Sequence, residues 1–149
     1  MSALITFGRN RMAYTALKSL ASKGIRTVVG DSFSPSMCFY SRHCREHFIY
    51  PSPYQHPRQF IEALARKGRE CGCQVVIPMH EEGFVIARHR RHLAPHLKIP
   101  LSDYDQIMLL HSKERFYDIA RKLDVPIPRT FIVGQDGAVS YTHLTLPTN

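Results

Sequence analysis

The sequence has no long hydrophobic run, no tryptophan and little cysteine. Its apolar stretches are far shorter than the roughly 20 residues that a membrane-spanning helix needs, and no signal peptide opens the chain. Four cysteines in 149 residues, without an export signal, predict reduced thiols in a cytoplasmic protein. We therefore expect no membrane partner and no disulfide scaffold.

Acidic residues are also in short supply. The 12 acidic residues stand against 20 lysines and arginines, which gives a formal net charge of +8. One explanation is nucleic-acid binding, since a basic surface attracts phosphates. The other is a solvated basic surface, or one that meets a smaller anion or another domain. The densest cluster, Ala87–His96, has no interleaved aromatic residues for base stacking, so we do not expect nucleic acid to be the partner.

The beginning of the chain predicts a strand, a helix and a second strand. Continuous apolar or β-branched runs predict the strands at Ala3–Phe7 and Ile25–Asp31. Apolar residues between them recur at the spacing of one helix face, and Gly24 is placed to end that helix. Short turns between such elements predict a parallel, right-handed βαβ unit.

The same alternation continues along the chain, apart from Ser32–His47, which has no clear period. The further predicted elements are strands at Phe48–Pro53 and Cys73–Pro78, helices from Pro57, at Glu81–Arg91, from Ser102 and at Ser112–Asp124, and a strand within Val125–Val133. This order predicts an α/β fold, Rossmann-like, with a mostly parallel sheet, helices on both faces and a helical linker. Ligands of such sheets gather at the carboxyl ends of the strands.

Gly8 follows the first predicted strand, where a dinucleotide-binding fingerprint would begin. That fingerprint needs three glycines so that the backbone can approach a pyrophosphate. Arg9–Met12 instead place bulky side chains at the second glycine position. Asp31 stands where a ribose-binding acid would, although an aspartate there is also an ordinary turn residue. We predict that Gly8 makes a tight strand-to-helix turn and does not cradle pyrophosphate.

Four stretches, in order, carry a resemblance to a known family: Leu4–Ser32, Tyr40–Leu64, Val75–Arg90 and Leu109–Thr130. Together they resemble the N-terminal part of ATP-grasp enzymes, in particular the carbamoyl-phosphate-synthase-like carboxylate–amine ligases. The resemblance implies a pre-ATP-grasp domain over residues 1–110, and a linker with the start of the ATP-grasp domain over 111–138. It implies a parent enzyme that joins a small-molecule carboxylate to an amine through an acyl phosphate, with ATP and Mg²⁺ as cofactors. The fragment itself is expected to be inactive and to bind neither cofactor firmly.

The resemblance also assigns residues to a site. Lys113 matches a lysine that touches nucleotide phosphate in the family, with Ser112 in place of the usual Asp or Asn; the alternative is a solvated surface lysine. Glu81 and Glu82 match a position where an acid faces the substrate, and stabilisation of a helix N-terminus stays open as their alternative. The same cleft could be lined by Gly8, Arg9 and Asn10, unless these are surface turn residues.

No metal site is predicted from the sequence. Cys71 and Cys73 stand closer together than the usual zinc-binding pair, and His89 and His92 lie on a separate predicted helix. A function of another class remains as the alternative to a ligase: a small non-enzymatic module that binds nucleotide or nucleic acid.

The end of the chain departs from the family pattern. The run Val139–Thr148 matches a translation of a common transposon-based sequencing adapter. Residues 139–149 are therefore expected to be an artefact of a truncated gene fragment and not part of the fold. The glycine-rich phosphate loop and late acidic metal ligands of an ATP-grasp domain are missing from the sequence, as a truncation would require.

Overall fold

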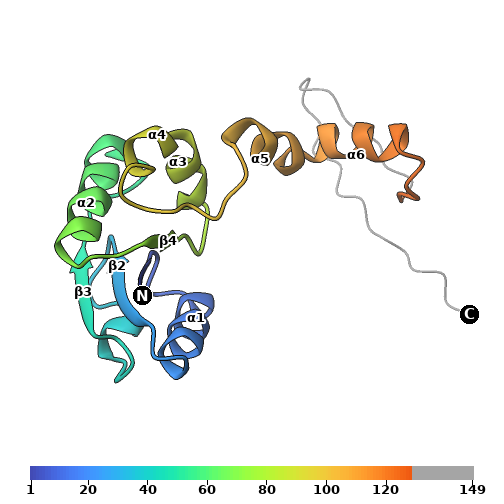
Figure 1. Cartoon of the computed structure of the whole chain (residues 1–149). Coiled ribbons are helices and arrows are strands. Elements are labelled where there is room, and N and C mark those ends of the chain that lie inside the picture. The colour runs from blue at the N-terminus through green and yellow to red at the C-terminus, as the bar shows by residue number, and fades with distance from the viewer. Residues whose placement is uncertain (129–149) are drawn as a thin grey trace, which may run out of the picture. The chain divides into compact units, whose positions relative to one another are not determined.

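The computed structural model describes residues 1–128, with two compact units that divide after Tyr104. The first unit is built on a four-stranded parallel sheet with strand order β3-β2-β1-β4 (Figure 1). The strands are β1 (Ser2–Ile5), β2 (Arg26–Asp31), β3 (Glu46–Ile49) and β4 (Val75–Ile77). The predicted α/β class with a parallel sheet is confirmed.

Parallel pairing brings the carboxyl ends of the strands to one edge of the sheet. Ile5, the last residue of β1, pairs with Val29 on one side and with Ile77 on the other. Asp31 ends β2 and pairs with Ile49 at the end of β3. The residues that follow these strands therefore share an edge, which we call the carboxyl edge.

One face of the sheet is covered by α2 (Pro57–Glu70), α3 (Glu82–Arg88) and α4 (Arg90–Leu93). Leu4 and Val28 point to this face and are fully buried. The helices contribute Phe60, Ile61, Leu64, Ile86 and Leu93 to the same core. Each large apolar side chain buried in this way stabilises the fold by about 1.5–3 kcal/mol.

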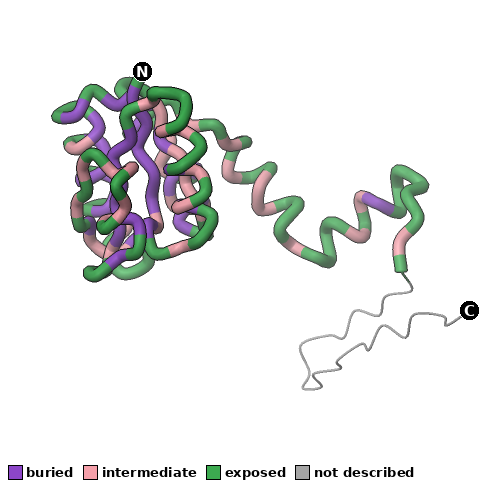
Figure 2. The backbone as a smooth tube through the Cα atoms, turned by 90° about the horizontal axis from the view of Figure 1, so that it is seen from below, coloured by how far each residue is buried: buried purple, intermediate pink, exposed green. Residues whose placement is uncertain are grey.

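The opposite face is covered by α1 (Arg11–Ser22) and by the 3₁₀ helix η1 (Met37–Tyr40). Ile5 and Val29 point here because successive side chains of a strand alternate between its faces. Strands β1 and β2 are largely buried between these layers, and the outward surfaces of the helices are more exposed (Figure 2). The prediction of helices on both faces is confirmed.

The ends of α1 follow from local chemistry. The Asn10 side chain accepts a hydrogen bond from the Met12 N–H at 2.9 Å and so caps the first turn. Gly24, with φ of 68°, takes the left-handed conformation that ends the helix, as predicted.

Three boundaries differ from the sequence prediction. β3 begins at Glu46 and ends at Ile49, earlier than the predicted strand at Phe48–Pro53. The helix predicted at Glu81–Arg91 is divided into α3 and α4 at His89, where ψ is 18°. The segment predicted to be irregular contains η1.

The second unit, described as far as residue 128, contains α6 (Lys113–Lys122), and α5 (Tyr104–His111) begins at the boundary. The later part of the strand predicted within Val125–Val133 and the segment 139–149 lie outside the described residues. No helix in the described part of the chain is both long and apolar enough to cross a membrane.

Candidate functional site

The turn after β1 forms the first part of the carboxyl edge. Its left-handed residue is Phe7, with φ of 55°, a conformation that is costly for a bulky side chain. Two of the hydrogen bonds that hold this turn are donated by Phe7 and Gly8. The Phe7 N–H donates to the Tyr50 hydroxyl at 2.9 Å, and the Gly8 N–H donates to the Gly30 carbonyl at 3.1 Å. The turn is thus hydrogen-bonded both to β2 and to the residue that follows β3.

Gly8 is required because of space. A Cβ atom at this position would lie 2.7 Å from Val29 Cγ1 and 2.9 Å from Ser36 Oγ. The Gly8 carbonyl also accepts from the Cys38 N–H at 3.1 Å, which brings η1 against the turn. The predicted tight turn is present, and close packing of β2 and η1 accounts for the glycine without a pyrophosphate.

Asp31 is the fully buried anchor of this edge. Its carboxylate accepts the Arg9 backbone N–H at 2.8 Å and the Ser36 hydroxyl at 2.9 Å. It also accepts the Phe33 N–H at 3.2 Å and pairs with the Arg9 guanidinium. Asp31 is therefore neither a free ribose acceptor nor a solvated turn residue, since it ties the turns after β1 and β2 together.

Arg9 reaches from this anchor toward solvent. Its hydrogen bonds and charge interaction with Asp31 raise the pKa of the guanidinium. Its Nη2 donates to Ser32 Oγ at 2.9 Å, and its guanidinium carbon lies 5.0 and 5.3 Å from the ring centres of Phe7 and Phe33. The side chain is still 37% exposed. Arg9 is thus a fixed cation that a ligand at the carboxyl edge can reach.

Glu82 is the second buried carboxylate of this edge and is completely inaccessible to solvent. Its Oε1 accepts the Thr6 hydroxyl at 2.5 Å, the Met79 N–H at 3.0 Å and the His80 N–H at 3.2 Å. These bonds fasten the turn between β4 and α3 to the end of β1. Its Oε2 is buried without a hydrogen-bond partner among the described residues. Glu82 thus fixes the positions of the turns that form this edge and does not present its carboxylate at the surface.

Unlike the buried Glu82, several polar side chains near it in sequence or at the same edge are exposed to solvent. Glu81 precedes α3 and is exposed. The His80 ring stacks on Phe7 with centroids 4.8 Å apart. Tyr54 is 58% exposed, and its pKa is raised by burial and by the charges of Glu82 and Glu81. The carboxyl edge therefore presents a carboxylate, an imidazole and a phenol beside the fixed Arg9.

The remaining predicted residues have local roles in the structure. Asn10 caps α1 and is only partly accessible. Lys113 is the first residue of α6 and is exposed, and Ser112 caps that helix by accepting the Arg115 N–H at 3.4 Å. Serine is one of the residue types preferred at this capping position. Lys113 belongs to the second unit, whereas the predicted residues 8–10, 81 and 82 belong to the first.

Two residues of the edge were missed by sequence reasoning. Tyr50 is 2% exposed, burial raises its pKa, and its hydroxyl holds the Phe7 turn. Thr6 is fully buried against Glu82. A usable signal was present, because both residues lie where predicted parallel strands end and such ends meet at one edge.

No group of three or more His, Cys, Asp or Glu side chains within residues 1–128 is arranged to hold a metal ion. All four cysteines are free thiols. The edge can bind and orient a polar ligand through Arg9 and Glu81.

Comparisons with known proteins give matches among solved structures alone. Neither the known protein families nor the curated proteins give a match. The L-amino acid ligase from Bacillus licheniformis matches 85% of this chain with a TM-score of 0.67 and 10% identity. The biotin carboxylase domain of a single-chain bacterial carboxylase matches 94% with a TM-score of 0.64 and 22% identity.

A third match was solved with bound nucleotide. It is the biotin carboxylase domain of 2-oxoglutarate carboxylase from Hydrogenobacter thermophilus, in complex with MgADP, ADP and bicarbonate, with 83% coverage, 15% identity and a TM-score of 0.60. This chain spans 31%, 32% and 28% of the three matched chains in the order given. At these identities the likeness establishes the shared fold, which agrees with the predicted pre-ATP-grasp domain.

Proposed function

We propose that this chain is the N-terminal part of an ATP-dependent ligase that joins a small-molecule carboxylate to an amine through an acyl phosphate. In this proposal residues 1–110 form the pre-ATP-grasp domain, and residues 111–138 form a linker and the start of the ATP-grasp domain. ATP and Mg²⁺ are the cofactors of the complete protein. Residues 139–149 are not part of it.

One observation carries the proposal: most of this chain shares its fold with about a third of each of several ATP-grasp enzymes. The four ordered stretches that resemble carboxylate–amine ligases support the same assignment. The free cysteines support a reducing, cytoplasmic location. Nothing in the geometry of the carboxyl edge favours a nucleic-acid-binding module in its place.

Residues of the carboxyl edge take different roles in the proposed enzyme. Arg9 and Glu81 line the substrate side, because their charged groups are accessible there. Asp31 and Glu82 are positioning residues, because their buried carboxylates hold the turns on which the edge is built. Lys113 contacts a nucleotide phosphate, which suits a cation next to a helix N-terminus.

Mg²⁺ would neutralise charge on the phosphoryl group in transfer. Its ligands are proposed to come from the ATP-grasp domain that follows in the complete protein. Within residues 1–128, Lys113 is the residue proposed to act on the nucleotide, through its charge. This division of roles explains why the 149-residue chain is proposed to be inactive alone.

The test begins with the gene. Sequencing the source locus beyond the codon for Gly137 should give a reading frame that continues into an ATP-grasp domain. The protein encoded by that frame should release ADP from ATP when a carboxylate and an amine are both supplied, with amino acids as the first panel. The 149-residue chain, assayed in parallel, should release none. The proposal fails if the locus encodes the same tail and a stop codon, or if ADP release needs neither substrate.

A further inference from the structure

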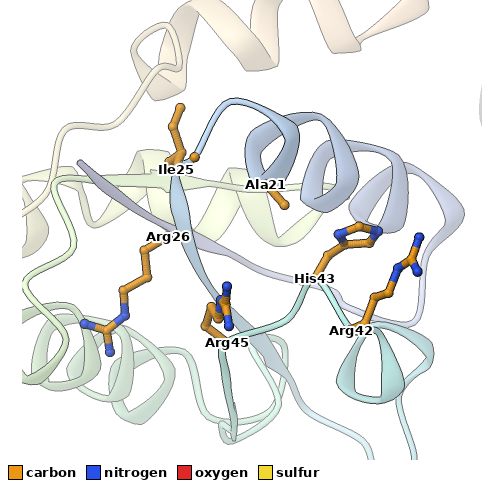
Figure 3. A pocket seen from close by; sticks show the side chains of 7 residues that line it. Ala21, Ile25, Arg26, Arg42, His43 and Arg45 are labelled. Carbon is orange, nitrogen blue, oxygen red and sulfur yellow. The ribbon is translucent and has the colours of Figure 1, made fainter.

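A basic pocket lies at the other end of the sheet, away from the carboxyl edge. It has a volume of about 340 Å³ and lies beside Arg26, the first residue of β2, and the segment that leads into β3 (Figure 3). Its lining residues are Ala21, Gly24, Ile25, Arg26, Arg42, His43 and Arg45. Since β2 runs from Arg26 to Asp31, the pocket and the Asp31 anchor lie at opposite ends of one strand.

Two of the three arginines have no compensating charge in the part of the chain that the structure describes. Arg26 pairs with Glu46 at 3.1 Å, and Glu46 also pairs with Lys67. Arg42 and Arg45, in contrast, have no carboxylate partner within residues 1–128. In Figure 3 their guanidinium groups and the His43 ring extend to the same side, toward the end of α1, whereas Arg26 points away. The pocket therefore has an excess of positive charge that the described fold does not use.

The segment that carries these cations is folded by its own hydrogen bonds. The Ser41 hydroxyl accepts the His43 N–H at 3.2 Å, and the Ser41 carbonyl accepts the Cys44 N–H at 2.9 Å. The Ser41 N–H donates to the Cys38 carbonyl at 3.1 Å, which joins the turn to the end of η1. This arrangement fixes the backbone from Ser41 to Cys44, on which Arg42 lies, so the loss of conformational freedom on binding an anion is reduced.

The wall opposite the cations carries no charge. Ala21 and Ile25 contribute half-buried apolar side chains. Two carbonyl groups at the end of α1 already accept hydrogen bonds, which reduces their repulsion of an anion. The Leu20 carbonyl accepts the Ile25 N–H at 3.0 Å, and the Ala21 carbonyl accepts the Gly24 N–H at 3.0 Å. A ligand here would meet cations on one side and a small apolar surface on the other.

We propose that this pocket binds a small phosphate monoester, with Arg42 and Arg45 on the phosphate and the apolar wall against its carbon chain. Guanidinium groups match phosphate oxygens in a bidentate geometry. The volume is that of a small-ligand site. The lining contains no Phe, Tyr or Trp on which nucleic-acid bases could stack, which disfavours a single strand. The site is separate from the proposed ligase chemistry and does not depend on it.

The test is an NMR titration of the isotopically labelled 149-residue chain with glycerol 3-phosphate at about 0.15 M salt. We expect saturable shifts of the backbone amides from Ser41 to Arg45 and of Ile25. Arg42→Gln combined with Arg45→Gln should weaken this binding by roughly tenfold or more. Arg66→Gln combined with Arg121→Gln is the matched control, since it removes the same charge from exposed sites elsewhere and should leave the affinity unchanged.

Inorganic phosphate and single-stranded DNA are titrated in the same way to separate the alternatives. Inorganic phosphate should shift the same amides at higher concentration, since it lacks the carbon chain.

Three results would overturn the proposal. One is no saturable shift at Ser41–Arg45 with millimolar glycerol 3-phosphate, and another is equal weakening by both double substitutions. The third is tighter binding of single-stranded DNA at these residues with a steep salt dependence, which would make the pocket part of a nucleic-acid surface.

Discussion

Gly8 leaves no room for a side chain between the turn after β1 and its neighbours. Gly8→Ala would place a Cβ atom 2.7 Å from Val29 Cγ1, inside the core beneath α1. We expect a loss of about 1–3 kcal/mol in the free energy of unfolding, since packed interiors resist an inserted methyl group. Urea unfolding followed by circular dichroism measures the loss.

Gly83→Ala is the matched control, with the same change in a different setting. A Cβ atom at Gly83 would lie 3.6 Å from Pro78 Cβ, which is ordinary contact. Because Gly83 lies in α3, alanine should be neutral or should stabilise the fold by up to about 1 kcal/mol. Equal losses at both positions would show that Gly8 has no special constraint.

Lys113 is the residue whose proposed role reaches furthest beyond the described fold. In the complete protein, Lys113→Met should raise the KM for ATP or lower kcat, because it removes a charge proposed to face phosphate and keeps most of the side chain's bulk. A charged hydrogen bond of this kind is worth about 1.5–3 kcal/mol, or at least tenfold in kcat/KM. The exposed Lys122, at the other end of α6, gives the control Lys122→Met. Unchanged ATP kinetics in Lys113→Met would make Lys113 an ordinary surface lysine.

At the scale of elements, β3 is an edge strand, and the carboxylate of its first residue, Glu46, pairs with cations on two neighbouring elements. Glu46 pairs with Arg26 on β2 at 3.1 Å and with Lys67 on α2 at 2.5 Å. Hydrogen bonds from Lys67 and from Cys71 hold the pKa of Glu46 below its ordinary value. The folded state therefore binds a proton at Glu46 less readily than the unfolded state does, and this difference makes the stability of the fold depend on pH.

The consequence can be measured with Glu46→Gln. A lowered folded-state pKa gives stability that is fully present above the ordinary glutamate value, about 4.3, and is lost as the pH falls through the folded value. We expect the natural chain to be more stable than Glu46→Gln by about 0.5–1 kcal/mol near neutral pH, because the group is partly exposed. The difference should shrink in acid. Glu62→Gln, on the exposed side of α2, should show no such change, and a constant difference for Glu46→Gln would contradict the pairing.

Glu46 also shows why some elements were predicted less well than others. β1, β2, α1 and α2 were predicted because apolar runs and helical periodicity are local signals. The start of β3 was missed because Glu46 is held in the strand by ion pairs with Arg26 and Lys67. These partners lie on β2 and α2 and are distant in sequence. The division at His89 was missed because the periodicity of Glu81–Arg91 continues across it.

The carboxyl edge was predictable in position but not in role. The predicted strand ends placed Arg9, Asp31, Glu81 and Glu82 at one edge, since parallel strands end together. That Asp31 and Glu82 are buried anchors depends on Ser36, Thr6 and the backbone N–H groups of Met79 and His80, which local patterns do not bring together. Glu81 and Glu82 were treated alike, yet one is exposed and the other has no solvent contact.

At the scale of the whole molecule, the first unit contains both hydrophobic clusters of the described chain. Every residue of these clusters lies before Tyr104. Within the second unit, Ala120 is the one buried residue of α6. Residues 1–104 should therefore fold alone, with a free energy of unfolding within about 0.5 kcal/mol of that of the whole chain. Amide spectra and urea unfolding of the shorter chain would check this, and loss of cooperative unfolding would contradict it.

β2 has a charged residue at each end: Arg26 beside the basic pocket and Asp31 at the carboxyl edge. At about 3.3 Å per residue, this strand keeps the Cα atoms of the two residues roughly 17 Å apart. The Debye length in physiological salt is about 8 Å, so solvent ions screen most of the field between a ligand in the exposed pocket and one at the exposed edge. The charge of an anion in the pocket should then leave the affinity for a substrate at the edge unchanged. Any communication between them would have to be mechanical, carried by a shift of the strand itself.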